Sequence, residues 1–135
     1  VGHVAIAGES PDGTVTARGF YPAKNSSLGD IAAGDVQGEV RDDISLYDAA
    51  VAGDPDIAIQ TLNVNQAQHD AALSFINGFA DTNSYNLYRC SCVTAALQSL
   101  NVAGVAAFNT STFGATPHAV HKAIELGLQI PRPAQ

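Results

Sequence analysis

Cys92 occupies a position where a cysteine can act as a nucleophile, because a loop gives way to an amphipathic helix at this residue. The loop is the run Tyr-Asn-Leu-Tyr-Arg-Cys-Ser-Cys over residues 85–92. The residues that follow have the i, i+3, i+4, i+7 spacing of one buried helical stripe: Val93, Ala96, Leu97 and Leu100. Unpaired N–H groups in a first helical turn favour a thiolate and can hold an oxyanion. The position therefore predicts a thiol with a lowered pKa.

His3 is the predicted general base for this thiol. It opens the alternating, β-branched segment Gly-His-Val-Ala-Ile-Ala-Gly over residues 2–8, which predicts a strand. A cysteine and a histidine far apart in sequence are typical of papain-like chemistry, since the pair meets only in the fold. Two alternatives stay open. Cys92 can be a buried structural thiol, the common state of free cysteine, or Cys90 can be the nucleophile, although it falls before the helix start.

The other cysteine and histidine spacings do not indicate a crosslink or a metal site. Cysteines one residue apart make a strained disulfide pair. A zinc site from Cys90, Cys92, His118 and His121 would have C-x-C and H-x-x-H spacings, which both miss the usual pattern. We therefore predict no metal and no cofactor. His118, His121 and His69 are expected on solvent-facing sides of helices.

The composition predicts one domain of 135 residues with its own core, because 46% of the residues are apolar and 14% are charged. A net charge of −7 with six Lys and Arg argues against nucleic-acid binding and against adsorption to anionic lipid. No apolar run approaches the ~18 residues of a spanning helix, so no stable membrane insertion is expected. The absence of methionine favours an excised domain or a processed product.

Turn and periodicity signals divide the chain into strands and helices. The predicted strands are 2–8 and 14–21, joined by a turn at 10–13, then 39–41 and 57–62, with 105–108 as a strand or buried loop. The predicted helices are 45–52, one capped by Asn65, one from Cys92, and one from Pro117 to Gly127. Residues 23–35 are expected to be a loop and 131–135 a loose tail. This mixture predicts an α+β domain over 1–135, with an antiparallel sheet packed against the nucleophile-bearing helix and a few further helices.

Five motifs occur in one order: Gly-His-Val-Ala-Ile (2–6), Asp-Gly-Thr-Val-Thr-Ala-Arg-Gly-Phe-Tyr-Pro (12–22), Gly-Glu-Val-Arg-Asp-Asp (38–43), Ala-Leu-Ser-Phe-Ile-Asn (72–77) and the cysteine run. Over about residues 2–103 the chain resembles the circularly permuted NlpC-type, papain-like cysteine hydrolases, in which the histidine precedes the cysteine. More closely, it resembles toxin domains of bacterial type VI secretion and Rhs-associated effectors. The resemblance implies a permuted papain-like fold, Cys92 as nucleophile, His3 as base and Tyr85 in the cleft.

The chain departs from this family at residues 90 and 91, where Cys90 and Ser91 replace two asparagines. A third group that orients the imidazole is also expected. Strand parity offers Thr16 and Arg18; a guanidinium is a poor partner for an imidazolium, so Thr16 is favoured. Glu9 lies at the wrong end of its strand. Asp42 and Asp43 are interpreted as a surface pair or loop cap.

The resemblance implies acyl transfer through a thiol in an antibacterial effector that is delivered into the envelope of a target cell. A phospholipid acyl ester is the favoured substrate, because permuted relatives act on lipids. A peptidoglycan stem-peptide amide is the alternative, and a non-catalytic binding module on the same fold is a second one. A neutralising immunity protein is the expected partner.

Overall fold

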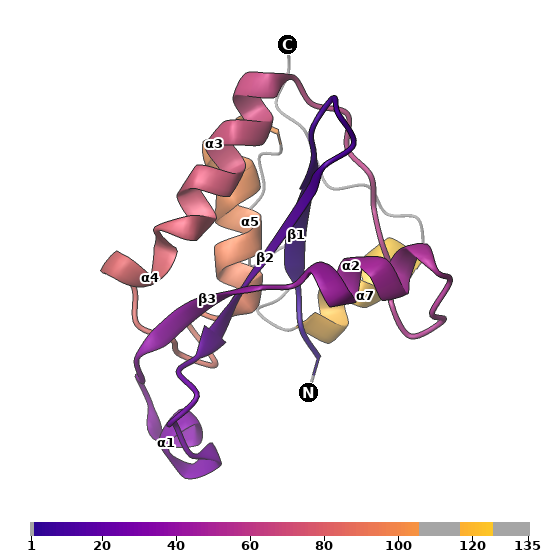
Figure 1. Cartoon of the computed structure of the whole chain (residues 1–135). Coiled ribbons are helices and arrows are strands. Elements are labelled where there is room, and N and C mark those ends of the chain that lie inside the picture. The colour runs from indigo at the N-terminus through magenta and orange to yellow at the C-terminus, as the bar shows by residue number, and fades with distance from the viewer. Residues whose placement is uncertain (1, 106–116, 126–135) are drawn as a thin grey trace.

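Three antiparallel strands form one sheet in the order β1-β2-β3 in the computed structural model, which describes residues 2–105 and 117–125 (Figure 1). They are β1 (Ala5–Glu9), β2 (Val15–Pro22) and β3 (Gly38–Asp42). Ala5 lies opposite Gly19 in the first pair, and Gly19 lies opposite Arg41 in the second. The predicted hairpin and the short strand after it are confirmed.

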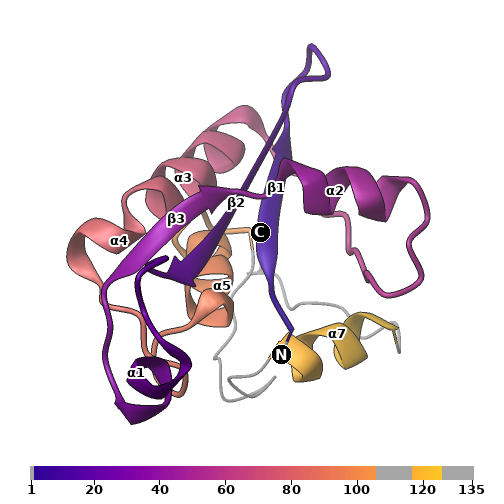
Figure 2. The ribbon, with the colours of Figure 1, turned by 60° about the horizontal axis from the view of Figure 1, so that its bottom comes forward.

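Helices surround this sheet. The described ones are α1 (Leu28–Ala33), α2 (Ile44–Val51), α3 (Gln66–Asn77), α4 (Phe79–Thr82), α5 (Cys92–Val102) and α7 (Pro117–Glu125). α3 and α5 pack against each other and against β2, whereas α2 lies on the other side of the sheet (Figures 1 and 2). α7 lies beside the start of β1 and contacts α5 (Figure 2). The α+β class predicted from the sequence is confirmed.

The main core lies between the sheet and the helices α3, α4 and α5. Phe20 of β2 is 1% exposed, and its ring contacts those of Phe79 and Tyr85 at centroid distances of 4.9 and 5.5 Å. Ile76 and Ala95 complete this cluster. Because side chains alternate along a strand, the burial of Phe20 on this side places Gly19 and Tyr21 on the opposite side of β2.

Side-chain caps begin the two long helices where the sequence indicates. Asn65 Oδ1 accepts from the Gln68 N–H at 2.8 Å at the start of α3, and Ser91 Oγ accepts from the Val93 N–H at 3.3 Å at the start of α5. In each helix the side chain of the third residue accepts in return from the backbone N–H of the cap residue, which completes a capping box. The second box sets Cys92 as the first residue of α5.

Two predicted elements are wrong. The interval 23–35 is not only a loop, because Ser27 and Asp30 form a capping box that begins α1. The interval 57–62 is not a strand; its alternating side chains line a cavity beside β1 instead of pairing in the described sheet. The predicted end of the last helix at Gly127, most of 105–108 and the tail 131–135 lie outside the described residues. No helix in the described ranges is long and apolar enough to cross a bilayer.

Candidate functional site

His3 is hydrogen bonded to a buried carboxylate. It lies just before β1, and the β1–β2 register extends to place it opposite Tyr21. Its Nε2 lies 2.8 Å from Asp43 Oδ2, and the Tyr21 hydroxyl donates to Asp43 Oδ1 at 2.5 Å. The Asp43 side chain is 9% exposed. One carboxylate therefore holds the imidazole of the segment before β1 and the phenol of Tyr21 on β2.

Ring contacts hold the same group from the side. The His3 and Tyr21 rings are stacked, with centroids 4.2 Å apart and planes 21° from parallel. The Arg41 guanidinium lies 4.4 Å from the centre of the Tyr21 ring. Burial, followed by the hydrogen bond to Asp43, raises the pKa of Tyr21 well above its usual value. Tyr21 is therefore a neutral hydrogen-bond donor at physiological pH.

Gly19 leaves the space in which the His3–Asp43 pair sits. A Cβ built on Gly19 would overlap Asp43 Oδ2 and would lie 2.5 Å from His3 Nε2, well inside van der Waals contact. Any other residue at this position of β2 would push the imidazole and the carboxylate apart or away from the sheet.

Cys92 is buried beside this pair. The residue is 3% exposed and packs with Val93, Leu97 and Val120, and Val4 lies against the same cluster. The backbone N–H groups of Val4, Val93 and Cys92 itself interact with the sulfur. Because Val4 follows His3 directly, the thiol lies next to the His3–Val4 peptide.

The pKa of the Cys92 thiol is raised, so the expectation of a lowered value is wrong. Burial is the largest cause, and the negative charge of Asp43 raises the pKa further; the three N–H groups oppose both effects without reversing them. Burial removes the water that would solvate a thiolate, and at this helix start that loss outweighs the stabilisation from the N–H groups. This thiol is therefore predominantly protonated at neutral pH.

The residues that form this cluster lie far apart in sequence. Cys92 and Asp43 influence each other electrostatically, as do Cys92 and Tyr21. Among the described residues the thiol is not hydrogen bonded to the imidazole, but such contacts often tighten only when substrate binds. Since Asp43 occupies Nε2 of His3, Nδ1 is the ring nitrogen that remains to accept a proton.

Thr16, the third group predicted from strand parity, is not brought to His3. It pairs with Gly8, five positions from Tyr21 along β2, which is about 16 Å at ~3.3 Å per residue. Tyr85 does lie near the thiol: it is buried, and the Cys92 charge adds to burial in raising the pKa of its phenol. Cys90 is half-buried, and burial raises its pKa.

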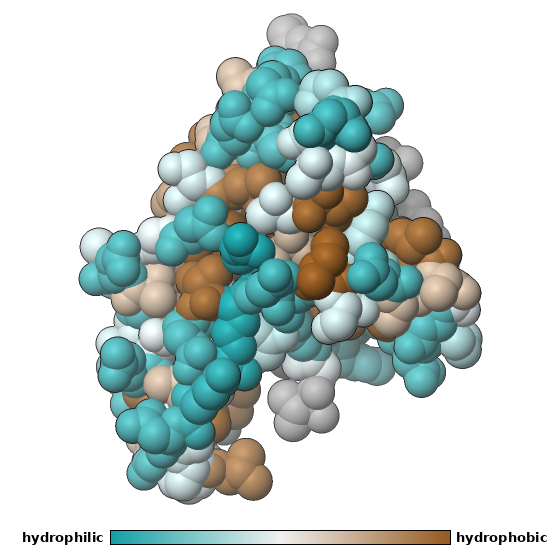
Figure 3. All heavy atoms as spheres, in the orientation of Figure 1, coloured by the Kyte–Doolittle hydropathy of each residue, from teal (hydrophilic) through white to brown (hydrophobic). Residues whose placement is uncertain are grey.

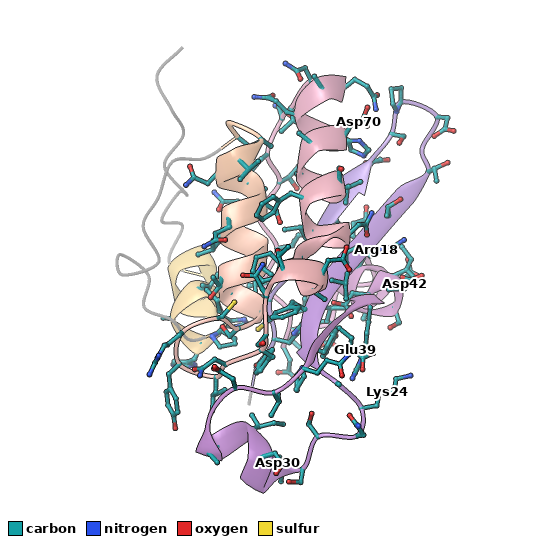
Figure 4. The ribbon with its side chains drawn as sticks, turned by 90° about the vertical axis from the view of Figure 1, so that its left-hand side faces the viewer. Arg18, Lys24, Asp30, Glu39, Asp42 and Asp70 are labelled. Carbon is teal, nitrogen blue, oxygen red and sulfur yellow. The ribbon has the colours of Figure 1, made fainter. Side chains whose placement is uncertain are left out.

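Asp43 is the residue that sequence reasoning missed. Its neighbour Asp42 fits the predicted surface role, since its side chain is 65% exposed, lies 3.9 Å from Arg18 and points outward with it (Figure 4). Asp42 Oδ1 also accepts from the Ile44 N–H at 2.8 Å where α2 begins. Alternation along the extended chain turns the next carboxylate to the opposite side, toward His3. Adjacent residues of an extended segment face opposite sides, so the two acids could not both be expected at the surface.

A cavity of about 780 Å³ opens beside β1, and His3 and Asp43 lie on its wall. Most of the other described residues that line it are apolar, and they come from β1, α2, the interval 56–64, α3, α5 and α7. Examples are Ile6, Leu46, Ile57, Leu62, Leu73 and Leu97. On the face seen in Figure 3, polar side chains cover β3, whereas apolar side chains are exposed between α3 and α2.

Comparison with known proteins identifies no relative. No family model matches the chain, and no curated protein or solved structure is significantly similar to it. Among the side chains that the structure describes, those of residues 2–105 and 117–121, no cluster of three or more from His, Cys, Asp or Glu could hold a metal ion. The site brings together a thiol, an imidazole hydrogen bonded to a buried carboxylate, and a largely apolar cavity.

Proposed function

We propose that this chain is a cysteine-dependent acyl hydrolase on a permuted papain-like fold, with Cys92 as nucleophile, His3 as general base and Asp43 as the residue that orients the imidazole. One observation carries the proposal. The His3 imidazole is hydrogen bonded through Nε2 to a buried carboxylate, and the next residue, Val4, contacts the Cys92 sulfur through its backbone. Nucleophile, base and orienting acid in this relation form the minimal machinery of thiol acyl transfer.

The raised pKa of Cys92 determines how the reaction begins. Because the resting thiol is protonated, its proton passes to His3 Nδ1 while the sulfur attacks the acyl carbon. The backbone N–H of Cys92, at the unpaired start of α5, is placed to stabilise the oxyanion. The imidazolium is stabilised by Asp43 and gives its proton to the leaving alcohol. Water, activated by neutral His3, then hydrolyses the thioester.

The apolar lining of the cavity supports an acyl chain as the group that is transferred, and therefore a phospholipid ester as substrate. A peptidoglycan stem-peptide amidase would use the same three residues and is the second candidate; its peptide substrate would leave most of the aliphatic wall without a partner. The resemblance noted above extends this proposal to an antibacterial effector domain that acts in the envelope of a target cell and is neutralised by an immunity protein.

The test is to incubate the purified chain separately with phosphatidylethanolamine vesicles and with peptidoglycan, and to quantify released fatty acid and muropeptides by mass spectrometry. Fatty acid release that is abolished in Cys92→Ala and retained in Cys90→Ser supports the proposal. Muropeptide release with the same dependence selects the amidase. Full activity in Cys92→Ala contradicts the thiol mechanism, and the absence of both products favours the binding module.

A further inference from the structure

Two buried polar atoms in the wall of the cavity have no hydrogen-bond partner in the described part of the chain. They are Nε2 of His69 and Oε1 of Gln60. Buried polar atoms are almost always hydrogen bonded, because an unsatisfied one costs the full loss of its hydration. The His69 side chain is 10% exposed, although the sequence predicted it on a solvent-facing side. These atoms are therefore candidates for contact with a ligand.

Both atoms are hydrogen-bond acceptors. His69 Nδ1 lies 2.9 Å from Asp70 Oδ1, and this contact is the largest cause that lowers the pKa of the Asp70 carboxyl. Since the ionised carboxylate only accepts, Nδ1 carries the hydrogen and Nε2 presents a lone pair in the neutral ring. Gln60 Oε1 is a carbonyl oxygen and accepts as well. The matching ligand group is a donor such as a hydroxyl.

The His69 ring is fixed in position at a distance from the His3–Asp43 pair. It packs over Gly8 of β1, where an added Cβ would lie 2.7 Å from Nε2 and 3.0 Å from Leu73. Gly8 is five positions beyond His3, about 16 Å along an extended chain. The side chains between them that line the cavity, including Ile6, Ala72 and Leu73, are apolar. His3 and Gly8 have opposite strand parity, so the cavity borders the His3–Asp43 pair on the α2 side of β1 and the His69 ring on the α3 side, with Gln60 elsewhere on its wall.

We propose that this cavity binds a fatty acyl chain that carries a hydroxyl group, with the hydroxyl held by His69 or Gln60 and the acyl group extending toward His3 on the cavity wall. This inference rests on the proposed acyl hydrolase and adds a substrate class to it. An unsubstituted fatty acyl chain fills the apolar part of the cavity but offers no hydrogen-bond donor to either acceptor atom, so the site should bind it less tightly. An amide N–H of a peptide would also supply a donor, but it would place polar backbone along the aliphatic wall.

The test measures binding separately from catalysis. Titration calorimetry with the full chain compares dodecanoic acid with its ω-hydroxy and β-hydroxy derivatives, and with a stem-peptide fragment. We expect one hydroxy acid to bind roughly tenfold more tightly than the plain acid, the gain from one or two hydrogen bonds to buried acceptors. At least one of His69→Phe, which keeps a ring over Gly8, and Gln60→Leu should reduce this ratio several-fold. His118→Phe, at an exposed position of α7, should leave it unchanged.

Equal binding of plain and hydroxylated acids to the wild-type chain overturns the inference, as does a ratio that survives in both His69→Phe and Gln60→Leu when circular dichroism shows them folded. Preferential binding of the peptide overturns it too. Nitrophenyl esters of the same acids then test the proposed function. Selective binding without Cys92-dependent ester cleavage leaves the hydroxyacyl site standing and refutes the hydrolase, whereas cleavage without selectivity refutes only the hydroxyacyl site.

Discussion

Asp43→Asn is the substitution that separates an orienting carboxylate from a structural one. The change keeps the size and shape of the side chain, so Tyr21 can still donate to Oδ1 and the stacked His3 and Tyr21 rings can stay in place. What disappears is the negative charge that lies 2.8 Å from His3 Nε2. In the proposed mechanism that charge stabilises the imidazolium that forms when the thiol proton passes to His3. The substitution should therefore lower kcat while leaving the fold intact.

The size of the effect follows from the burial of the pair. Two unit charges about 4 Å apart interact by about 4 kcal/mol at an effective dielectric constant of ~20. The Asp43 side chain is 9% exposed and the His3 side chain 21%, so solvent screening removes part of this energy. Because the single amide oxygen of asparagine stays with the Tyr21 hydroxyl, its NH2 group faces His3 Nε2 and no hydrogen bond from Nε2 offsets the lost charge. A net loss of about 2–3 kcal/mol corresponds to a fall in kcat of roughly 30- to 150-fold.

The assay pairs ester hydrolysis with alkylation of Cys92 by iodoacetamide, followed by peptide mass spectrometry. Because the Asp43 charge raises the pKa of Cys92, its removal should leave alkylation unchanged or faster while turnover falls. Faster alkylation of Cys90 as well would indicate loosening of the fold. Asp42→Asn is the matched control, since an amide oxygen can still accept from the Ile44 N–H. Turnover within threefold of wild type in Asp43→Asn, or an equal loss in Asp42→Asn, would refute the orienting role.

Three further results are expected. Gly19→Ala should cost about 1–3 kcal/mol of stability in urea unfolding and at least tenfold in turnover, because its Cβ overlaps the His3–Asp43 pair; unchanged turnover would contradict the geometry of the pair. Tyr21→Phe keeps the stacked ring but removes a hydrogen bond to a charged group, so turnover should fall about tenfold, and a loss below twofold would show that the hydroxyl is dispensable. The free energy of unfolding should fall above about pH 8.5, because the unfolded chain releases its thiol proton there while folded Cys92, whose pKa is raised, retains it. Urea unfolding at pH 8 and pH 10 measures this loss, and Cys92→Ala should reduce it. The same loss in wild type and in Cys92→Ala would argue against the raised pKa.

The elements of this fold were predictable wherever local chemistry alone decides them. The turn at residues 10–13 and the flanking alternation specify the hairpin, and the capping residues Asn65 and Ser91 specify where α3 and α5 begin. The interval 57–62 shows where such signals fail. All six of its residues line the cavity and Ile59 is 53% exposed, so the alternation marks neither a paired strand nor a single buried side.

The sequence singles out Cys92 and His3 as candidate site residues, but it does not single out the carboxylate that is hydrogen bonded to His3. Cys92 and His3 stand out because helix starts and strand starts are visible in sequence. Asp43 is polar, adjacent to another acid and located at the end of a strand, all of which describe a surface residue equally well. Its partner is 40 positions away, and only the register of β2 against β1 and β3 brings the two side chains to the same side of the sheet.

Gly19 provides the sequence signal that could have resolved this choice. A glycine in the interior of a central strand weakens the strand, and it commonly marks a place where another group approaches the backbone closely. Here that strand is paired on both sides, and the groups over Gly19 are the imidazole of His3 and the carboxylate of Asp43. The side chains over Gly19 must come from its own side of the sheet, and Asp43, two positions beyond its cross-strand partner Arg41, lies on that side. Thr16, three positions before Gly19 on the same strand, faces the opposite side, so parity about the glycine argues against Thr16.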